Sequence, residues 1–323
     1  MPSDATLLLL DKGAVEKLLL PQDVLDAVRE AFQLHSQREG RVFPVIREAL
    51  SSGGIFGIKS GDVQSQGLLG FKAAGFWPSN RSVGGEPHQA TILLFDPATG
   101  RPLCVIDGNA ITTGRTAAAG GLGLELLARS NSRRACVFGS GAQAQAQLMT
   151  ALRMVPALKE LRYLTWNRQP DSRFERHFAD LCELSHARDA NEAVSGSDIV
   201  ITATPGSAAL FDAAAVQAGT HINCVGADTR GKRELPEGLL ARARVVVDDR
   251  EQARQIGECQ WAPDTPCEEI GDLLTGKLAF ARSASDITVF DMTGLALQDL
   301  TVARLVHQKA RDNGLGTSLA WPW

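Results

Sequence analysis

The chain has 323 residues, of which 44% are apolar and 22% charged, and this composition is typical of a soluble globular protein of about two domains. The net charge of -4 is not gathered into any block of like charges, so the sequence offers no basic surface for nucleic acid or a membrane. The apolar run at residues 7–10 is too short for a secretion signal or a membrane-spanning helix. The six cysteines are scattered without a C-x-x-C motif, which favours a cytoplasmic protein with free thiols and neither disulfides nor bound zinc.

The first third of the chain predicts a mixed α+β domain. Residues 7–10 are expected to form a strand and residues 20–38 a helix, because apolar side chains recur there at helical spacing behind Pro21. Short β-rich runs then alternate with glycine and proline, and the expected strands are residues 55–58, 68–71, 91–95 and 103–106. Residues 96–100 form a turn between the last two, which predicts a hairpin within an antiparallel sheet.

The pattern changes after Arg115, where strand-like and helical stretches begin to alternate. The expected helices are residues 116–128, 142–154, 173–184 and 297–311, and the expected strands are residues 135–138, 161–166, 199–203, 221–225, 244–247 and 287–290. Such alternation predicts βαβ units in a parallel sheet. We therefore expect an α/β protein with a Rossmann-type domain at residues 116–296 and an α+β antiparallel-sheet domain formed by residues 1–115 and 297–323.

A glycine-rich motif lies between the first strand and helix of the expected Rossmann domain. The sequence from Gly139 to Ala144 reads G-x-G-x-x-A, in which Gly139 permits the tight turn and Gly141 lets a pyrophosphate approach the backbone. We expect Gly139, Gly141, Ala142 and Gln143 to bind the dinucleotide at the start of the helix, where free N–H groups and the helix dipole favour an anion. The alternative is a glycine-rich turn that binds no ligand.

The second strand of this domain ends at Asn167 and Arg168. An NAD-preferring site usually has an acid here for the ribose 2′-hydroxyl, whereas an arginine can pair with a 2′-phosphate. The sequence therefore favours NADP(H) over NAD(H), with a solvated surface arginine as the alternative. Further cofactor contacts are expected from Thr116, Thr202, Thr204 and Val225.

Cationic residues stand before the Rossmann domain. Two arginines can grip a carboxylate with forked hydrogen bonds, and a desolvated lysine can transfer a proton. Arg47, Lys72 and Arg115 are the candidates for these tasks, whereas Lys59 is expected to be a structural or rim lysine. Asp228 follows a strand at the carboxyl end of the sheet, where an acid facing a nicotinamide is expected.

Several motifs in combination resemble the ornithine cyclodeaminase/mu-crystallin family over nearly the whole chain. They lie at residues 88–100, 107–118, 138–143, 221–226 and 288–294. The resemblance implies a nicotinamide-dependent oxidoreductase that acts on a small amino acid or cyclic imino acid. It also implies a homodimer, in which the antiparallel-sheet domain binds substrate and joins the subunits.

The resemblance also implies roles for single residues. Arg47, Lys72 and Arg115 match the family's substrate-carboxylate binders, and Asp228 matches the acid that handles the proton on the substrate nitrogen. Thr293 matches a residue that lies against the nicotinamide. Lys72 and Asp228 are thus both candidates for the catalytic proton transfer.

The sequence combines features of two branches of the family, the cyclodeaminases and the mu-crystallins. The cyclodeaminases hold the distal amine with a glutamate where this chain has Gly57, which disfavours ornithine. His88 and residues 166–168 are similar to the mu-crystallin branch, whereas Asp228 and residues 231–235 are similar to the cyclodeaminases. His88 is expected either to bind substrate or to be a loop histidine bonded to backbone.

We expect a ketimine reductase, which uses NADPH to reduce a pyrroline- or piperideine-2-carboxylate. The alternatives are cyclodeamination of ornithine to proline and ammonia, and dinucleotide-dependent binding without turnover. The presence of both Lys72 and Asp228 argues against the last of these.

Overall fold

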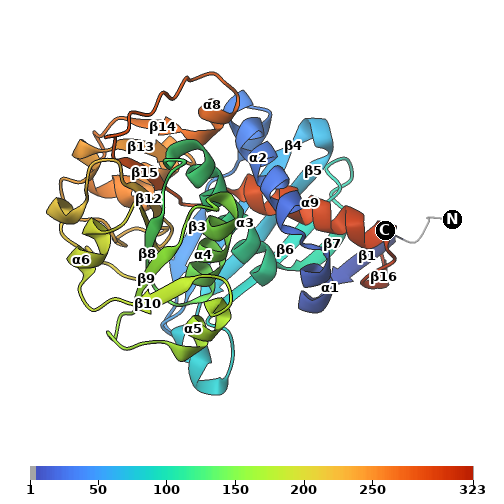
Figure 1. Cartoon of the computed structure of the whole chain (residues 1–323). Coiled ribbons are helices and arrows are strands. Elements are labelled where there is room, and N and C mark those ends of the chain that lie inside the picture. The colour runs from blue at the N-terminus through green and yellow to red at the C-terminus, as the bar shows by residue number, and fades with distance from the viewer. Residues whose placement is uncertain (1–4, 323) are drawn as a thin grey trace. The chain divides into compact units, whose positions relative to one another are not determined.

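The computed structural model describes residues 5–322, so residues 1–4 and Trp323, the ends of the expected sheet domain, lie outside it. The chain forms two compact units (Figure 1). Unit 1 takes residues up to Arg115 and from Leu295 onward, and unit 2 is Thr116–Gly294. No helix in residues 5–322 has both the length and the apolar character needed to span a membrane. All six cysteines are free thiols.

Unit 1 is built on one eight-stranded sheet. Its strands are β1 (Ala5–Leu10), β2 (Gly40–Val42), β3 (Ile46–Ala49), β4 (Ile55–Val63), β5 (Leu68–Phe76), β6 (His88–Phe95), β7 (Pro102–Asp107) and β16 (Thr317–Trp321). They run in the order β16-β1-β7-β6-β5-β4-β2, with β3 paired to β4. The sheet is antiparallel as expected, except that β1 pairs with β7 in parallel.

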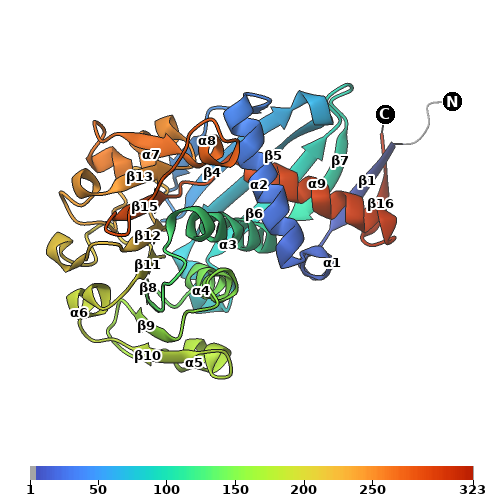
Figure 2. The ribbon, with the colours of Figure 1, turned by 45° about the horizontal axis from the view of Figure 1, so that its top comes forward.

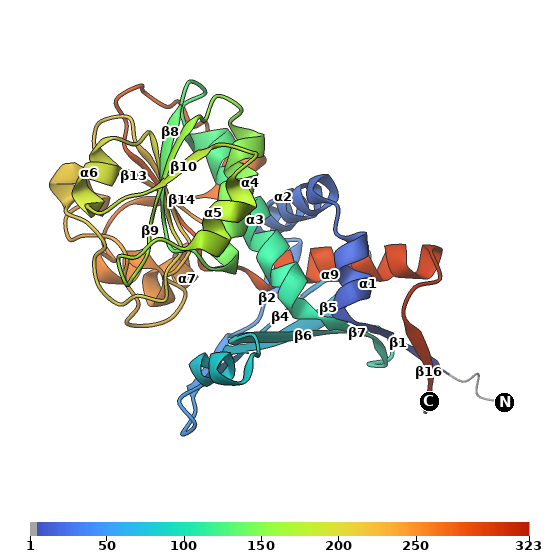
Figure 3. The same cartoon turned by 60° about the horizontal axis from the view of Figure 1, so that its bottom comes forward.

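Helices cover one face of this sheet (Figure 3). They are α1 (Lys12–Leu18), α2 (Pro21–Gln37) and α9 (Ala296–Asp312). Helix α2 starts with proline at its first position, where the missing N–H costs nothing, and ends at Arg38 in the left-handed conformation. Its apolar stripe, including Val28 and Phe32, is buried, as is His35. Two ion pairs, from Arg304 to Glu30 and from Lys309 to Asp23, further join α9 to α2.

Unit 2 is a doubly wound parallel sheet. Its strands are β8 (Arg134–Phe138), β9 (Glu160–Leu164), β10 (Glu183–His186), β11 (Ile199–Thr202), β12 (His221–Cys224), β13 (Arg244–Val247), β14 (Cys267–Glu269) and β15 (Thr288–Asp291). They run in the order β10-β9-β8-β11-β12-β15-β13-β14, as Figure 2 shows for the first seven. The order reverses between β8 and β11, the switch point at which such sheets bind ligands beyond their carboxyl ends.

Helices lie on both faces of the parallel sheet. They are α3 (Gly108–Leu127), which begins in unit 1, α4 (Ala142–Met154), α5 (Ser172–Phe178), α6 (Ala190–Ser195), α7 (Arg250–Ile256) and α8 (Ile270–Leu274). Alternate residues of each strand therefore enter different cores: Val137 packs with Leu148 and Phe178, whereas Phe138 packs with Cys224. A strand buried on both faces is continuously apolar, which explains why the sequence predicted these strands well.

One predicted helix is wrong in its second half. The expected helix at residues 173–184 ends at Phe178, and β10 begins at Glu183. Phe174 and Phe178 are one helical turn apart and both are buried. Beyond them the partly buried Leu184 and His186 follow a period of two, which is the pattern of a strand.

Candidate functional site

The glycine-rich turn of unit 2 has the geometry that a dinucleotide requires. Gly139 has a φ of +110°, and a Cβ there would lie 2.7 Å from the Ala203 carbonyl oxygen, so only glycine fits. At Gly141 a Cβ would meet nothing within 4 Å, which leaves open space beside the start of α4. No side chain in the described part of the chain, residues 5–322, caps this end of α4. The first N–H groups, from Ala142 and Gln143, are therefore available to an anion, and the residues present fit a pyrophosphate.

The turn after β9 presents the residues expected to bind the adenosine end of the cofactor. Arg168 is exposed and has a φ of 57°, with its N–H bonded to the Thr165 carbonyl 3.1 Å away. The Asn167 side chain accepts a hydrogen bond from the backbone N–H of Gln169 at 3.1 Å. Trp166 is 95% exposed. The turn therefore points its polar and aromatic side chains outward, where a ligand can reach them.

Asp171 connects this turn to the glycine-rich motif. One of its carboxylate oxygens accepts from the Ser140 hydroxyl at 2.8 Å, and the other caps α5 by accepting from the N–H groups of Arg173 and Phe174. These bonds, led by the one from Ser140, hold the pKa of Asp171 below its ordinary value. An ionised carboxylate thus braces the glycine-rich turn.

A buried glutamate ties together the carboxyl ends of β11 and β12. Each oxygen of Glu234 accepts two hydrogen bonds, at 2.7–2.8 Å. Oε2 accepts from the hydroxyl of Thr202 and the N–H of Gly226, and Oε1 accepts from the hydroxyl and the N–H of Thr204. The hydroxyl protons of Thr202 and Thr204, both expected cofactor contacts, are thereby committed to Glu234. Val225 donates its N–H to the Thr202 carbonyl at 2.8 Å, beside the same strand ends.

A second buried glutamate holds the segment that carries Glu234. Glu258 accepts from the backbone N–H groups of Glu234 and Leu235 at 2.6 and 3.2 Å. Burial and the carboxylate of Asp291 raise the pKa of Glu258 to about 8, and burial raises the pKa of Asp291 to about 7. Because the pair is buried under the strand ends, it carries a proton near neutral pH.

Asp228 lies between the end of β12 and Glu234, in a loop with several anchors. Its Oδ1 accepts from the Lys232 ammonium at 2.6 Å and from the Thr229 hydroxyl at 3.1 Å. The side chain of Gln260 accepts from the N–H of Gly231 at 2.8 Å and donates to carbonyls of the loop. The side chain of Asp228 is 36% exposed, so the loop presents a carboxylate that a ligand can reach.

Thr293 and Thr116 are both buried in polar surroundings. The Thr293 hydroxyl donates to Asp248 at 2.6 Å and accepts from the Gln252 side chain at 2.6 Å. The carbonyl of Thr116 accepts from the Gln147 side chain at 2.8 Å. These bonds fix the position of each residue, and the expected contacts with the cofactor stay predictions.

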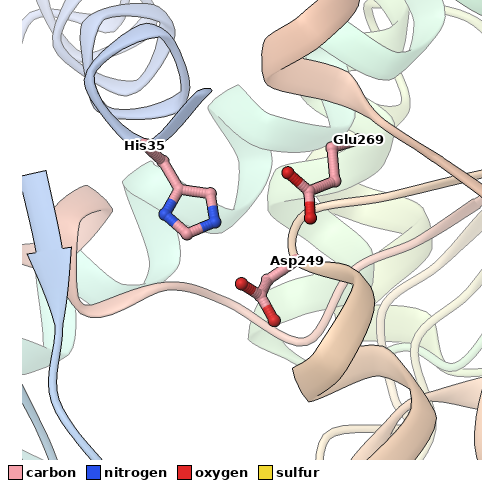
Figure 4. A group of neighbouring side chains, drawn as sticks. All are labelled: His35, Asp249 and Glu269. Carbon is pink, nitrogen blue, oxygen red and sulfur yellow. The ribbon is translucent and has the colours of Figure 1, made fainter. Parts of the chain in front are cut away.

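Two carboxylates lie at the start of α7 (Figure 4). Asp249 caps this helix by accepting from the N–H of Gln252 at 2.6 Å, and Glu269 accepts from the N–H of Arg250 at 3.2 Å. Both carboxylates therefore have a structural task within unit 2. His35, also drawn in Figure 4, belongs to α2 of unit 1.

In unit 1 the sheet register places the expected substrate binders on the helix-covered face. Lys59 on β4 pairs with Lys72 on β5, and Arg47 on β3 pairs with Gly57, two residues from Lys59. Residues two apart on a strand share a face, and so do residues paired across strands. We call Arg47, Lys59, Lys72 and Arg115 of α3 the cation cluster. Lys59, Lys72 and Arg115 are buried, so Lys59 is not the exposed rim lysine that the sequence allowed.

Lys72 and Arg115 share one carboxylate, that of Asp299, which was not among the residues predicted from the sequence. Oδ1 of Asp299, on α9, accepts from Nζ of Lys72 at 2.7 Å and from Nε of Arg115 at 3.0 Å. Lys72 also donates to the Thr112 hydroxyl at 3.3 Å. Burial, and then the cations Arg115 and Arg47, lower the pKa of Lys72 to about 8, against the opposing effect of Asp299. Burial opposes ionisation of Asp299 as well, but Lys72 and Arg115 hold its pKa below the ordinary value.

His88 starts β6 and lies beside the first turn of α3. Its Nδ1 is 3.1 Å from the side-chain oxygen of Asn109, and the Asn109 amide donates to the carbonyl of His88 at 3.1 Å. A bond to a neighbouring side chain gives His88 a structural contact, and substrate binding by His88 stays a prediction.

Of the two carboxylates that were not predicted, Asp299 and Glu234, only Asp299 had a signal in the sequence. Asp299 stands in a helix where Ala296, Leu300 and Ala303 are on the same side, so an acid lies on an apolar face. A charged residue there must be paired, because an isolated buried charge is too costly. Glu234 offers no such periodic signal.

Comparison with known proteins decides the family. The sequence profile of the ornithine cyclodeaminase/mu-crystallin family matches residues 6–314. The chain belongs to the ornithine cyclodeaminase/mu-crystallin family. The resemblance seen in the sequence is thereby confirmed.

Relatives within this family match the chain over almost its full length. It is 32% identical over 318 residues to the iminosuccinate reductase of Paracoccus denitrificans, covering 96% of this chain and 98% of that one. An archaeal alanine dehydrogenase dimer with bound NAD has a TM-score of 0.91 at 33% identity, over 98% of this chain and all of that one. The Δ1-pyrroline-2-carboxylate reductase of Thermococcus litoralis, in complex with NADH and L-proline, has a TM-score of 0.88 at 28% identity, over 96% and 99%. This confirms the predicted fold class.

Proposed function

We propose that this chain is an NAD(P)H-dependent reductase that reduces the C=N bond of a small α-imino acid. One observation carries the proposal: Lys72 and Arg115 are buried side by side on a single carboxylate oxygen of Asp299. Two cations against one carboxylate leave a surplus of positive charge in a buried place, and such a charge requires an anionic partner. A substrate carboxylate supplies that anion. The relatives named above, which act on imino or amino acids, are consistent with this.

The residues of the chain divide the work as follows. Arg115 and Arg47 hold the carboxylate through directional N–H donors, and Lys72 adds an ammonium. When bound, the reduced nicotinamide supplies the hydride. Lys72, or Asp228 once its carboxylate has taken up a proton, gives a proton to the substrate nitrogen, because reduction of a neutral imine without protonation would create a costly anion. Lys72, with a pKa of about 8, is able to release a proton close to neutral pH.

We propose a cyclic ketimine as the substrate, such as a pyrroline- or piperideine-2-carboxylate. The structure of β4 supports this over ornithine: a Cβ at Gly57 would lie 2.8 Å from the carbonyl oxygen of Ile46, so a side chain does not fit without movement of β3. Gly57, at the position where the cyclodeaminases carry a glutamate, therefore supplies no carboxylate for a distal amine. An open-chain imino acid is the second candidate, supported by the near full-length match to an iminosuccinate reductase.

Cofactor consumption distinguishes these activities. The absorbance of NADPH and NADH is followed with cyclic ketimines, with pyruvate or oxaloacetate plus ammonia, and separately with ornithine plus catalytic NAD(P)⁺. A reductase oxidises one equivalent of cofactor per imine, whereas a cyclodeaminase releases ammonia from ornithine without net consumption. Tight cofactor binding with no turnover on any of these compounds would favour the binding protein instead.

We propose NADP(H) as the preferred cofactor. The support is the exposed Arg168 in the turn after β9, which can pair with a 2′-phosphate. Asp171 is the acid among residues 165–171, and its oxygens accept hydrogen bonds from Ser140 and from the start of α5. The related structures contain NAD or NADH, so the proposed preference for NADP(H) applies to this chain and not to those relatives.

We also propose that the chain is a homodimer joined through unit 1. The helices of this unit cover one face of its sheet (Figure 3). The opposite face carries half-buried apolar side chains in register, such as Phe71, Leu93 and Val105. No α-helix among residues 5–115 and 295–322 covers that face. A contiguous apolar face of this kind is typical of an interface, and a second copy of the same face can cover it by two-fold symmetry.

A further inference from the structure

We infer that Asp299 is a positioning residue for substrate binding: it holds Lys72 and Arg115 together, both charged, so that they present one site to a carboxylate. The inference rests on the proposed function, because it assigns to the cation cluster the carboxylate of an imino acid. It concerns a residue on α9 that lies 227 positions from Lys72 along the chain. Nothing in the glycine-rich motif or the cofactor site is involved.

The geometry of the carboxylate supports this role. Oδ1 accepts from both cations, at 2.7 and 3.0 Å, and Asp299 has no exposed surface. Oδ2 is buried as well and accepts no hydrogen bond from the residues that the structure describes. Among the described residues, no further donor therefore competes with Lys72 and Arg115 for a hydrogen bond to this carboxylate.

The elements around Lys72 explain why a carboxylate is needed there. Arg47 on β3, Lys59 on β4 and Arg115 on α3 all face the same region as Lys72. Burial and the cations Arg115 and Arg47 each favour the neutral amine of Lys72 over the ammonium. Asp299 opposes all of them, so it keeps Lys72 charged at neutral pH.

A neighbouring residue completes the anchor without adding charge. The side chain of Gln298, next to Asp299, accepts from Nη1 of Arg115 at 3.3 Å and from the backbone N–H of Leu295 at 2.9 Å. The guanidinium is thus fixed from two successive residues at the start of α9. Since Nε and Nη1 of Arg115 are engaged in this way, Nη2 remains as the donor best suited to a bound carboxylate.

The test is the pKa of Lys72 in variants that differ in charge and little in shape. Lysine labelled with ¹³C at Cε is titrated by NMR, and the Lys72 signal is assigned with K72R. Asp299→Asn removes the charge and should lower the pKa of Lys72 by about 1–3. Arg115→Gln removes a competing cation and should raise it. Asp62→Asn, a change on β4 at a residue whose carboxylate pairs with Arg41, is the control and should leave the signal unchanged.

Kinetics supply the second measurement. In the wild type the KM for the imino acid should rise above pH 8, where Lys72 loses its proton. In Asp299→Asn that rise should begin at correspondingly lower pH, while the Kd for NADPH stays within about twofold. A merely structural ion pair would change stability and leave the pH dependence of KM in place.

The outcomes separate this inference from the proposed function. A shifted Lys72 titration without turnover on any imino acid would refute the proposed reaction and leave Asp299 as the anchor of the cation cluster. An unchanged titration in folded Asp299→Asn would overturn the inference. If that variant does not fold, Arg115→Gln decides, since a lowered or unchanged pKa of Lys72 there contradicts the proposed balance of charges.

Discussion

The buried acid pair under the strand ends of unit 2 makes stability depend on pH in an unusual direction. Glu258 has an ordinary pKa of 4.5, and in the fold it is about 8. Between these values the unfolded chain is ionised and the folded chain keeps its proton, so the folded state binds more protons. Stability therefore falls as the pH rises from 4.5 to 8, whereas most paired carboxylates stabilise a fold over this range.

The magnitude follows from the shift. A difference of about 3.5 pKa units at about 1.36 kcal/mol each gives an upper value of about 5 kcal/mol lost across the range. Glu258→Gln replaces the titrating carboxyl with a neutral amide and turns one acceptor into a donor. That change costs about 1–3 kcal/mol at pH 5, because the N–H of Glu234 or Leu235 loses its acceptor. At pH 8 the cost should be cancelled or reversed.

The assay is urea unfolding at a series of pH values from 5 to 8, with wild type, Glu258→Gln and the exposed control Glu237→Gln. The control should follow the wild type at every pH. The free energy of unfolding of Glu258→Gln should vary much less with pH, so that the two curves approach or cross. Parallel curves for the wild type and Glu258→Gln would refute the reasoning, since Glu258 would then titrate alike in both states.

The remaining predictions concern the reaction, the cofactor and the assembly. Asp228→Asn should lower turnover on the best ketimine by about 10²–10⁴-fold with little change in NADPH affinity; near wild-type turnover would assign the proton to Lys72 or water. Arg168→Ala should reduce the preference for NADPH over NADH by about tenfold or more, measured as the ratio of Kd values. Equal Kd values in the wild type would contradict the NADP(H) proposal. Sedimentation at micromolar concentration should show a dimer of the 34.5 kDa chain that dissociates in Leu93→Glu, with circular dichroism as the folding control; a wild-type monomer would exclude it.

The cofactor motif was predictable because its constraints are local. Only glycine tolerates the φ of Gly139 and the nearby carbonyl of Ala203, and the small Ala144 packs against the same turn. The φ of Gly139 and the packing of Ala144 are requirements within six residues, visible as a spacing in the sequence, whereas the contact with Ala203 appears only in the folded sheet. The long apolar strands were predictable for a similar reason, since burial on both faces leaves a continuous hydrophobic run.

Short elements gave no such signal. Strands β2, β3 and β14 have three or four residues, too few for a period of two to be distinguished from chance. β16 is exposed along its whole length and joins the sheet only through its pairing with β1. The strand register that places Lys59 beside Lys72 is likewise a property of the folded sheet, so it could not be predicted from the sequence that Lys59 joins the cation cluster.

Asp299 and Glu234 show why the partners of a site are harder to predict than the residues that act. Each is an acid whose importance comes from donors on distant elements, on β5 and α3 for Asp299 and on β11 and β12 for Glu234. Asp299 orients Lys72 and Arg115, whereas Glu234 fixes the strand ends from which the loop of Asp228 starts, and neither acid is exposed to a ligand. A carboxylate suits this task because it accepts several hydrogen bonds at once and stabilises the cations it orients. Substitution of Asp299 should therefore change how Lys72 titrates and binds, and this effect is separable from the loss of Lys72 itself.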